Sequence, residues 1–144
     1  MKIYISSDHG GYNLKGYVKK YVSESGYEIE DLGTNSEESV DYPDYAEKLC
    51  KKVFENKAKG ILICGTGIGM SMSANKMKGI RAALCGNEYL AKMSRRHNNS
   101  NVLCLGGRVI GEELACNIVK VWLETDFSKE ERHHKRVGKI NKLD

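Results

Sequence analysis

A glycine-rich turn is the part of the sequence best suited to chemistry. Residues 64–71 read Cys-Gly-Thr-Gly-Ile-Gly-Met-Ser and follow a short apolar run. Glycines at alternate positions, Gly65, Gly67 and Gly69, free backbone N–H groups to point into one concavity, which suits an oxyanion or a phosphate. The turn lacks the Gly-Lys-Ser/Thr of a P-loop, and Met70 stands where a dinucleotide fingerprint needs glycine. The sequence therefore predicts an anion-binding turn of neither standard nucleotide type.

Cys64 occupies the last position of the apolar run, directly before this turn. A thiol near the N-terminus of a helix forms its thiolate more readily, so Cys64 is a candidate base or nucleophile. The alternative is that Cys64 is a small buried apolar residue, as most free cysteines are. We assign that second role to the other four cysteines, which are Cys50, Cys85, Cys104 and Cys116.

A second polar turn, Ser-Asp-His-Gly-Gly at residues 7–11, follows the first apolar segment. Asp8 can accept hydrogen bonds from a ligand and His9 can donate to one, while two glycines let the backbone approach closely. The alternative interpretation is that Asp8 caps the following helix, which is a common role for aspartate. The turn by itself does not separate these two roles.

The third cluster is Arg-Arg-His-Asn-Asn at residues 95–99, and a Gly-Gly-Arg turn follows at residues 106–108. His97 lies in a polar turn that enters a strand, where it can act as a proton donor, and Asn98 can bind a hydroxyl group. A single histidine is more often structural. The two arginines are equally well explained as charges at the C-terminus of a helix.

The C-terminal segment, residues 128–143, is mostly charged but has an apolar edge, so we expect a helix there. Ser128 is its predicted N-cap, with Glu131 in the capping-box position. Arg132 and Arg136 are four residues apart and share one face, which suits gripping a phosphate from one side. A helix this polar buries little against its own domain, so we expect it to pack across a subunit boundary.

The net charge of the chain is concentrated in the same segment. The chain carries 23 Lys and Arg against 19 Asp and Glu, a net charge of +4, and residues 129–144 hold 6 basic and 3 acidic residues, a net of +3. A nucleic-acid-binding protein usually spreads a basic stripe over its surface. The charge distribution therefore favours a small anionic ligand over a polyanion.

The order of the predicted elements indicates an α/β protein. Apolar runs of strand length, typical of strands buried on both faces, alternate with stretches of helical periodicity. This pattern predicts a three-layer, Rossmann-like fold with a five-stranded, mostly parallel sheet and an extending C-terminal helix, all in a single domain over residues 1–144. The expected strands are Lys2–Ser6, Tyr27–Leu32, Ile61–Cys64, Gly79–Leu84 and Val102–Leu105, and the expected helices are Tyr12–Ser25, Tyr45–Asn56 and Leu114–Leu123.

Composition excludes several classes of protein. At 144 residues the chain suits one domain, and 40% hydrophobic with 29% charged residues is typical of a globular protein. No apolar run is long enough to span a bilayer, and the amino terminus enters a strand without a signal-peptide pattern. Five cysteines without a Cys-x-x-Cys pair indicate neither a disulfide framework nor a zinc site. We expect a cytoplasmic protein with no metal and no membrane contact.

Taken together, six motifs make the chain resemble the ribose-5-phosphate isomerase B family over its whole length. They are Ser-Asp-His-Gly-Gly at 7–11, Asp-Tyr-Pro at 41–43, Ile-Cys-Gly-Thr-Gly-Ile-Gly at 63–69, Arg-His-Asn at 96–98, Gly-Arg-Val at 107–109 and Arg-His-x-x-Arg at 132–136. The resemblance implies interconversion of an aldose phosphate and a ketose phosphate without metal or organic cofactor. It also implies a homodimer, alternatively a tetramer, whose sites are shared between subunits.

The resemblance also implies roles for individual residues. Cys64 is the base that moves a proton between C2 and C1 of the sugar, and the N–H groups of residues 65–69 stabilise the enediolate oxygen. The elements carrying His97 and Arg108 reach the site from the partner subunit. His97 is implied to be the acid in ring opening, and Thr66 is implied to assist proton transfer. Tyr42 is implied to form a wall of the pocket. The implied binding residues are Asp8 and Asn98 for hydroxyl groups, Gly65, Gly67, Ile68 and Gly69 for the oxyanion, and His9, Arg108, Arg132 and Arg136 for the phosphate or the sugar.

Three other functions stay open at this point. A relative acting on a six-carbon sugar, allose or galactose 6-phosphate, differs from the leading prediction only in pocket length. A non-catalytic module that binds a phosphate ligand predicts binding without proton exchange, and the position of Cys64 argues against it. Nucleic-acid binding through the basic tail ranks lowest, because the tail mixes acids with its bases and has no aromatic residue for stacking.

Overall fold

The computed structural model describes all residues of the chain, 1–144. Strands and helices alternate along most of it, as the apolar pattern predicts. In chain order the elements are β1 (Lys2–Ser7), the short 3-10 helix η1 (His9–Gly11), α1 (Tyr12–Glu24), β2 (Glu28–Asp31), α2 (Tyr42–Asn56), β3 (Lys59–Cys64), α3 (Ile68–Ala74), β4 (Ala82–Leu84), α4 (Glu88–Arg96), β5 (Val102–Gly106), α5 (Glu112–Glu124) and α6 (Glu131–Asn141).

The five strands form one sheet in the order β2-β1-β3-β5-β4, and every pair is parallel. The sequence predicts a mostly parallel sheet, and the structure makes it entirely so. β3 and β5 lie inside the sheet and are buried along their length, because both faces carry helices. Their pairing places Gly60 opposite Val102 and Cys64 opposite Gly106, so the two strands end together.

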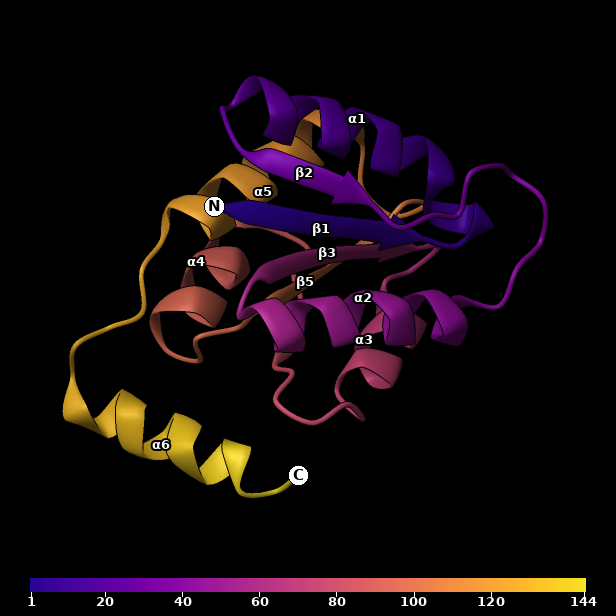
Figure 1. Cartoon of the computed structure of the whole chain (residues 1–144). Helices are drawn as coiled ribbons and strands as arrows, with labels where there is room; N and C mark the ends of the chain where they lie inside the picture. Colours follow the sequence, from indigo (N-terminus) through magenta and orange to yellow (C-terminus); the bar gives the residue numbers. More distant parts are fainter.

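Helices cover both faces of the sheet, giving the three predicted layers (Figure 1). Side chains alternate between the faces along each strand. In β3, Ile61 and Ile63 join the core under α1, α4 and α5, which includes the fully buried Trp122. Leu62 and Cys64 face the other core, under α2 and α3. The thiol of Cys64 therefore lies on the α2 and α3 side of the sheet.

Two elements begin three residues away from their predicted starts. α2 begins at Tyr42, three residues earlier than predicted, with Pro43 in its first turn, where the missing N–H of proline removes no helical bond. The fourth strand is limited to Ala82–Leu84, because the segment before it turns at Gly79, which has a φ of +76°.

The predicted cap of the C-terminal helix is wrong. The backbone is still extended at Glu130, so the helix begins at Glu131. The hydroxyl oxygen of Ser128 accepts from the N–H of Glu130, only two residues away, and forms a local turn before the helix. Figure 1 shows α6 standing apart from the sheet and its covering helices, as expected for the extending helix. No helix of the chain is both long enough and apolar enough to cross a membrane.

Candidate active site

The carboxyl ends of β1, β3 and β5 meet at one edge of the sheet and carry the predicted chemical turns. Backbone bonds join the turns: the N–H of Asp8 donates to Ile63 O at 3.2 Å, and the N–H of Gly107 donates to Cys64 O at 2.8 Å. β1 leads to α1 on one face of the sheet, whereas its neighbour β3 leads to α3 on the other. Ligands of open parallel sheets bind at such a divergence, so this edge is the candidate active site.

Cys64 lies at the centre of this edge with 4% of its surface exposed. Its Sγ accepts a hydrogen bond from the backbone N–H of Gly67 at 3.1 Å. Gly67 directs this N–H at the sulfur because its φ is +81°, a left-handed conformation that glycine adopts without strain. A backbone N–H aimed at the sulfur stabilises negative charge on it, which is what a thiolate base requires.

The remaining cysteines differ in environment from Cys64. Burial raises the pKa of Cys50 to about 12 and raises the pKa of Cys85, Cys104 and Cys116 as well. Cys50, Cys85 and Cys104 are buried, and Cys116 is half-buried. These four side chains remain thiols at neutral pH, as predicted from their positions in apolar segments.

The glycine-rich turn has fewer free N–H groups than its sequence predicts. The N–H of Gly67 is bonded to Cys64, and the N–H of Ile68 donates to Thr66 Oγ1 at 3.2 Å. The N–H groups of Gly65, Thr66 and Gly69 donate to no other group of the protein. These three N–H groups, and not all five, are available to an oxyanion beside Cys64.

Two glycines of the turn allow larger side chains to approach. A Cβ at Gly69 would lie 2.5 Å from the ring of Tyr42, the first residue of α2. A Cβ at Gly65 would lie 3.2 Å from a guanidinium nitrogen of Arg108, in the turn after β5. Tyr42 and Arg108 therefore border the Cys64 turn from its two sides, within one chain.

Asp8 does cap the helix that follows it, since its Oδ1 accepts from the N–H of Gly11 at 3.1 Å. Its other carboxylate oxygen makes no hydrogen bond, so the cap leaves Asp8 able to bind a hydroxyl as well. His9 accepts from the N–H of Val40 through Nδ1 at 3.2 Å. In the neutral ring this bond leaves the proton on Nε2, so His9 presents a donor to a ligand.

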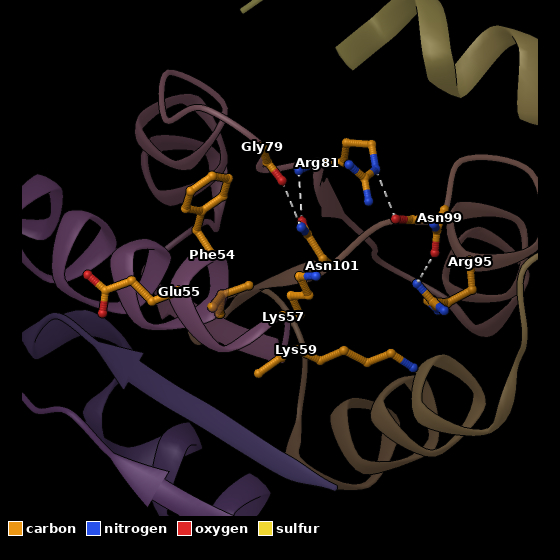
Figure 2. A pocket seen from close by; sticks show the side chains of 11 residues that line it. Phe54, Glu55, Lys57, Lys59, Gly79, Arg81, Arg95, Asn99 and Asn101 are labelled. Atoms are coloured by element: carbon orange, nitrogen blue, oxygen red, sulfur yellow. Dashed lines mark hydrogen bonds between the residues drawn. The ribbon is translucent and has the colours of Figure 1, made fainter.

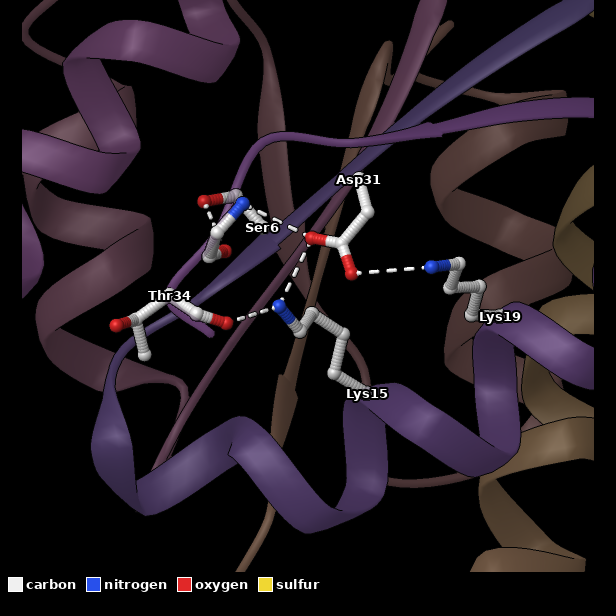
Figure 3. Close-up of polar contacts among 6 residues, drawn as sticks. Ser6, Lys15, Lys19, Asp31 and Thr34 are labelled. Atoms are coloured by element: carbon white, nitrogen blue, oxygen red, sulfur yellow. Dashed lines mark hydrogen bonds and ion pairs between the residues drawn. The ribbon is translucent and has the colours of Figure 1, made fainter. Parts of the chain in front are cut away.

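A buried polar cluster, which the sequence analysis did not identify, holds the loop that leads from β2 to Val40 and Tyr42 (Figure 3). Lys15 of α1 is 2% exposed and pairs with Asp31 at 2.8 Å, while donating a second bond to the carbonyl of Thr34. Although burial raises the pKa of Asp31, the bonds from Lys15 and from the N–H of Gly33 outweigh it, and the pKa lies below its usual value. Only the position of Lys15 between the core residues of α1 signals this pair in the sequence.

Four predicted site residues lie elsewhere. His97 is the C-cap of α4, and Asn98 follows it, so both precede β5. Arg132 and Arg136 lie on α6, where Arg132 pairs with Glu130 at 2.7 Å. His97 stacks on His133 of α6, with ring centroids 4.3 Å apart, and this contact joins α6 to α4. We call His97, Asn98, Arg132 and Arg136 the amino-edge group.

The amino-edge group is separated from Cys64 by the length of a strand. β3 and β5 are parallel and paired from Gly60 and Val102 to Cys64 and Gly106. Four residue steps at about 3.3 Å each separate the two edges by roughly 13 Å. A single chain thus does not bring His97 to Cys64. Arg108, which the resemblance places on the partner's side, lies instead against Gly65 of its own chain.

The candidate active site of one chain is the carboxyl-edge group. Its members border the Cys64 turn and come from four segments of the chain; they are Asp8, His9, Tyr42, Cys64, Gly65, Thr66, Gly67, Ile68, Gly69 and Arg108. No three His, Cys, Asp or Glu side chains come together in the chain as a metal site requires.

Comparison with known proteins identifies the family of the chain. The family model for ribose/galactose isomerases matches residues 3–140. The ribose-5-phosphate isomerase B of Escherichia coli is 44% identical over 144 residues, which cover 99% of this chain and 96% of that protein.

Two solved structures are equally similar along their length. The ribose-5-phosphate isomerase B of Clostridium thermocellum superposes with a TM-score of 0.96 at 52% identity, covering 99% of this chain and 97% of that one. The ribose 5-phosphate isomerase of Thermotoga maritima superposes with a TM-score of 0.94 at 53% identity, covering 98% and 97%. The chain belongs to the ribose/galactose isomerase family.

Proposed function

We propose that this protein is an aldose–ketose isomerase that interconverts ribose 5-phosphate and ribulose 5-phosphate. The observation that carries the proposal is the environment of Cys64, whose sulfur accepts the N–H of Gly67 beside three unbonded N–H groups. A base and an oxyanion site side by side are what proton transfer next to a carbonyl needs. The similarity to ribose-5-phosphate isomerases supports the choice of substrate.

In the isomerisation, the Cys64 thiolate removes the C2 proton of the open-chain aldose. The electron pair of that C–H bond forms the C1–C2 double bond of a cis-enediolate, and the carbonyl oxygen takes the negative charge. The free N–H groups of Gly65, Thr66 and Gly69 stabilise this oxygen. Thr66 Oγ1 assists proton transfer from O2 to O1, and the Cys64 thiol then returns its proton to C1, which gives the ketose.

Binding and ring opening need groups from both edges of the sheet. Within one chain, Asp8 and Tyr42 contact the sugar, while His9 and Arg108 contact its phosphate. His97 of a second copy donates a proton to the ring oxygen, and the proton of the anomeric hydroxyl passes to water. Asn98 of that copy holds a hydroxyl, and its arginines Arg132 and Arg136 complete the phosphate site.

A homodimer with shared sites would bring the two groups of residues together, and two observations support it. The amino-edge group lies a strand length from Cys64 of its own chain, and α6 projects from the body of the molecule (Figure 1). Exposed apolar side chains from α3, β4, α4 and the turn after β5 suit burial against a second copy. They are Ile68, Met72, Leu84, Tyr89, Leu90 and Val109, between 39% and 69% exposed.

The test of the reaction is proton exchange in D₂O, followed by NMR with ribose 5-phosphate, allose 6-phosphate and galactose 6-phosphate side by side. We expect the fastest turnover, with deuterium entering at C1 or C2, for ribose 5-phosphate. Cys64→Ala removes the base and lowers the rate by about 100- to 10,000-fold. The matched control is Cys116→Ala, which removes a half-buried thiol of α5, a helix that packs on the opposite face of the sheet from Cys64. Binding without exchange, or full activity of Cys64→Ala, contradicts the proposal.

The shared site is tested by mixing two inactive variants, Cys64→Ala and His97→Ala. After subunit exchange in an equimolar mixture, about half of the dimers are mixed, and each of these has one intact site. The mixture therefore recovers about a quarter of the wild-type activity. Sites built within single chains recover none, because every chain then carries one defect.

A further inference from the structure

A cavity of about 530 Å³ opens at the amino edge of the sheet, away from the Cys64 turn (Figure 2). Its walls come from the end of α2, from the turn at Gly79 to Arg81, and from the segment that joins α4 to β5. These segments precede β3, β4 and β5, whereas the carboxyl-edge group follows β1, β3 and β5. The cavity is therefore separate from the carboxyl-edge group of its own chain, and it borders the segment that carries His97 and Asn98.

The walls of the cavity carry a strong excess of positive charge. Four cations line it, Lys57, Lys59, Arg81 and Arg95, against one carboxylate, Glu55. None of the four cations has a carboxylate oxygen within 4.0 Å. The cations of the cavity thus differ from the buried Lys15, which pairs with Asp31.

Arg95 shows the charge excess most clearly, because only 6% of its surface is exposed. Its guanidinium donates to three neutral acceptors, the carbonyl oxygens of Thr125 and Ser100 and the Oδ1 of Asn99. Arg81, which is half-buried, donates to the carbonyl oxygen of Asn99 and to an amide oxygen of α6, and it feels the charge of Asp144, whose Oδ2 accepts from the N–H of Gly79 at 2.9 Å. A buried charge with neutral partners alone costs free energy that a bound anion recovers.

Lys59 shares its surroundings with Arg95. Its Nζ lies 5.6 Å from the ring centroid of Trp122, and the guanidinium carbon of Arg95 lies 6.0 Å from the same centroid. Burial lowers the pKa of Lys59 to about 8, with the charge of Arg95 lowering it further and that of Asp126 raising it. Asp126 is the opposing charge that acts on both Lys59 and Arg95, and it forms no ion pair with either cation.

Helix ends explain part of this charge. The helices α2, α4 and α5 all end at this edge of the sheet, and cations suit the negative ends of helix dipoles. Arg95 donates to the carbonyl oxygen of Thr125, the residue directly after α5, and so stabilises the C-terminal end of that helix. That role does not require four cations around one open cavity.

We propose that this cavity binds a small phosphate-bearing anion, a phosphate monoester or diphosphate, at a second site that is distinct from the Cys64 turn of the same chain. The Nη2 groups of Arg81 and Arg95 make no hydrogen bond to the protein and can donate to phosphate oxygens, and the two lysines add charge. The cavity exceeds the size of a phosphate group, and the ring of Phe54, 54% exposed, gives it an apolar wall for the organic part of such a ligand.

The test is calorimetric titration of inorganic pyrophosphate, with NMR of the Lys59 side chain to locate binding. Pyrophosphate also enters the isomerase centre, so Arg108→Met is the background in which that site is weakened. In this background Lys59→Met and Arg81→Met each weaken binding at the cavity at least tenfold, because each removes a charged contact. Lys20→Met, which removes an exposed charge on α1, changes it less than twofold.

The NMR readout adds a second criterion. Bound pyrophosphate raises the pKa of Lys59 from about 8 toward the ordinary value for lysine, and the shift saturates with the calorimetric titration. The proposal is overturned if Lys59→Met and Arg81→Met both bind like Lys20→Met, or if pyrophosphate leaves the Lys59 signals unchanged. Lys59 and Arg81 lie on different walls of the cavity, so the test can still be made if one of the two variants does not fold. Because the readout is binding, the result is independent of turnover.

Discussion

Replacing Gly67 with alanine tests whether the turn geometry activates Cys64. Gly67 has a φ of +81°, and a Cβ there would lie 2.5 Å from Leu84 Cδ1 and 3.0 Å from the carbonyl carbon of Leu105. The left-handed backbone costs about 1–2 kcal/mol for alanine, and the overpacking costs about 1–3 kcal/mol. We therefore expect the free energy of unfolding to fall by about 2–5 kcal/mol.

The same substitution acts on catalysis through the sulfur. Relief of the clash moves the N–H that donates to Cys64 Sγ at 3.1 Å. A hydrogen bond to a charged group contributes about 1.5–3 kcal/mol, so its loss lowers kcat/KM by about 10- to 150-fold. The steady-state rate with ribose 5-phosphate measures this loss.

Gly79→Ala is the matched control. Gly79 has a φ of +76°, and a Cβ there would lie 2.6 Å from the ring of Phe54, so its substitution combines the same strain with a similar clash. Gly79 lies at the opposite edge of the sheet, and we expect a comparable loss of stability but a rate within about twofold of wild type. If folded Gly67→Ala and Gly79→Ala proteins have equal rates, the N–H of Gly67 does not support the base.

Two further predictions concern the polar contacts. Lys15→Met leaves Asp31 buried without its cation and lowers the free energy of unfolding by about 3–5 kcal/mol in urea, whereas Lys19→Met, at an exposed 3.4 Å pair, costs less than about 1 kcal/mol. Because the pKa of Asp31 is lowered in the folded protein, the stabilisation that Asp31 contributes is complete above its pKa in the unfolded chain and is lost as the pH falls through its pKa in the folded protein. The prediction is refuted if Lys15→Met and Lys19→Met lose equal stability, or if the difference between them does not change in acid. Burial, followed by the charge of His97, lowers the pKa of His133 in the folded protein. The contact between α6 and α4 is therefore complete above the usual histidine pKa of about 6.5, and it weakens as the pH falls through the lowered pKa of His133. NMR signals of α6 that do not change over this pH range contradict the prediction.

Much of the fold can be predicted from local patterns. The continuous apolar runs of β3 and β5 identify buried parallel strands, and helical spacing identifies α1 and α5. The start of α6 was predicted wrongly because Ser128 has the right residue type for a cap, and only the extended backbone at Glu130 shows that the helix starts later. Residue type alone cannot distinguish a cap from a local turn.

The candidate site was predictable in part. Position after or at the end of a strand predicts that Asp8, Cys64 and Arg108 lie at one edge of the sheet, and the structure brings them together there because parallel strands end at one edge. His97 comes before β5, so the same rule places it at the opposite edge, as the structure has it. The buried Lys15 pair, by contrast, joins segments that are distant in the sequence, and no local pattern encodes such a contact.

The strand order has a consequence for synthesis of the chain. β5 is the last strand made, yet it lies between β3 and β4, so both of these lack their neighbour until residues 102–106 have left the ribosome. An open strand edge pairs readily with other chains. β4 is only three residues long, so it offers few backbone groups for pairing with another chain before β5 is made. β3, with six residues, is then the longer open strand edge. A nascent chain that stalls between β4 and β5 therefore exposes the open edge of the strand that ends in Cys64, and aggregation at that stage involves this strand.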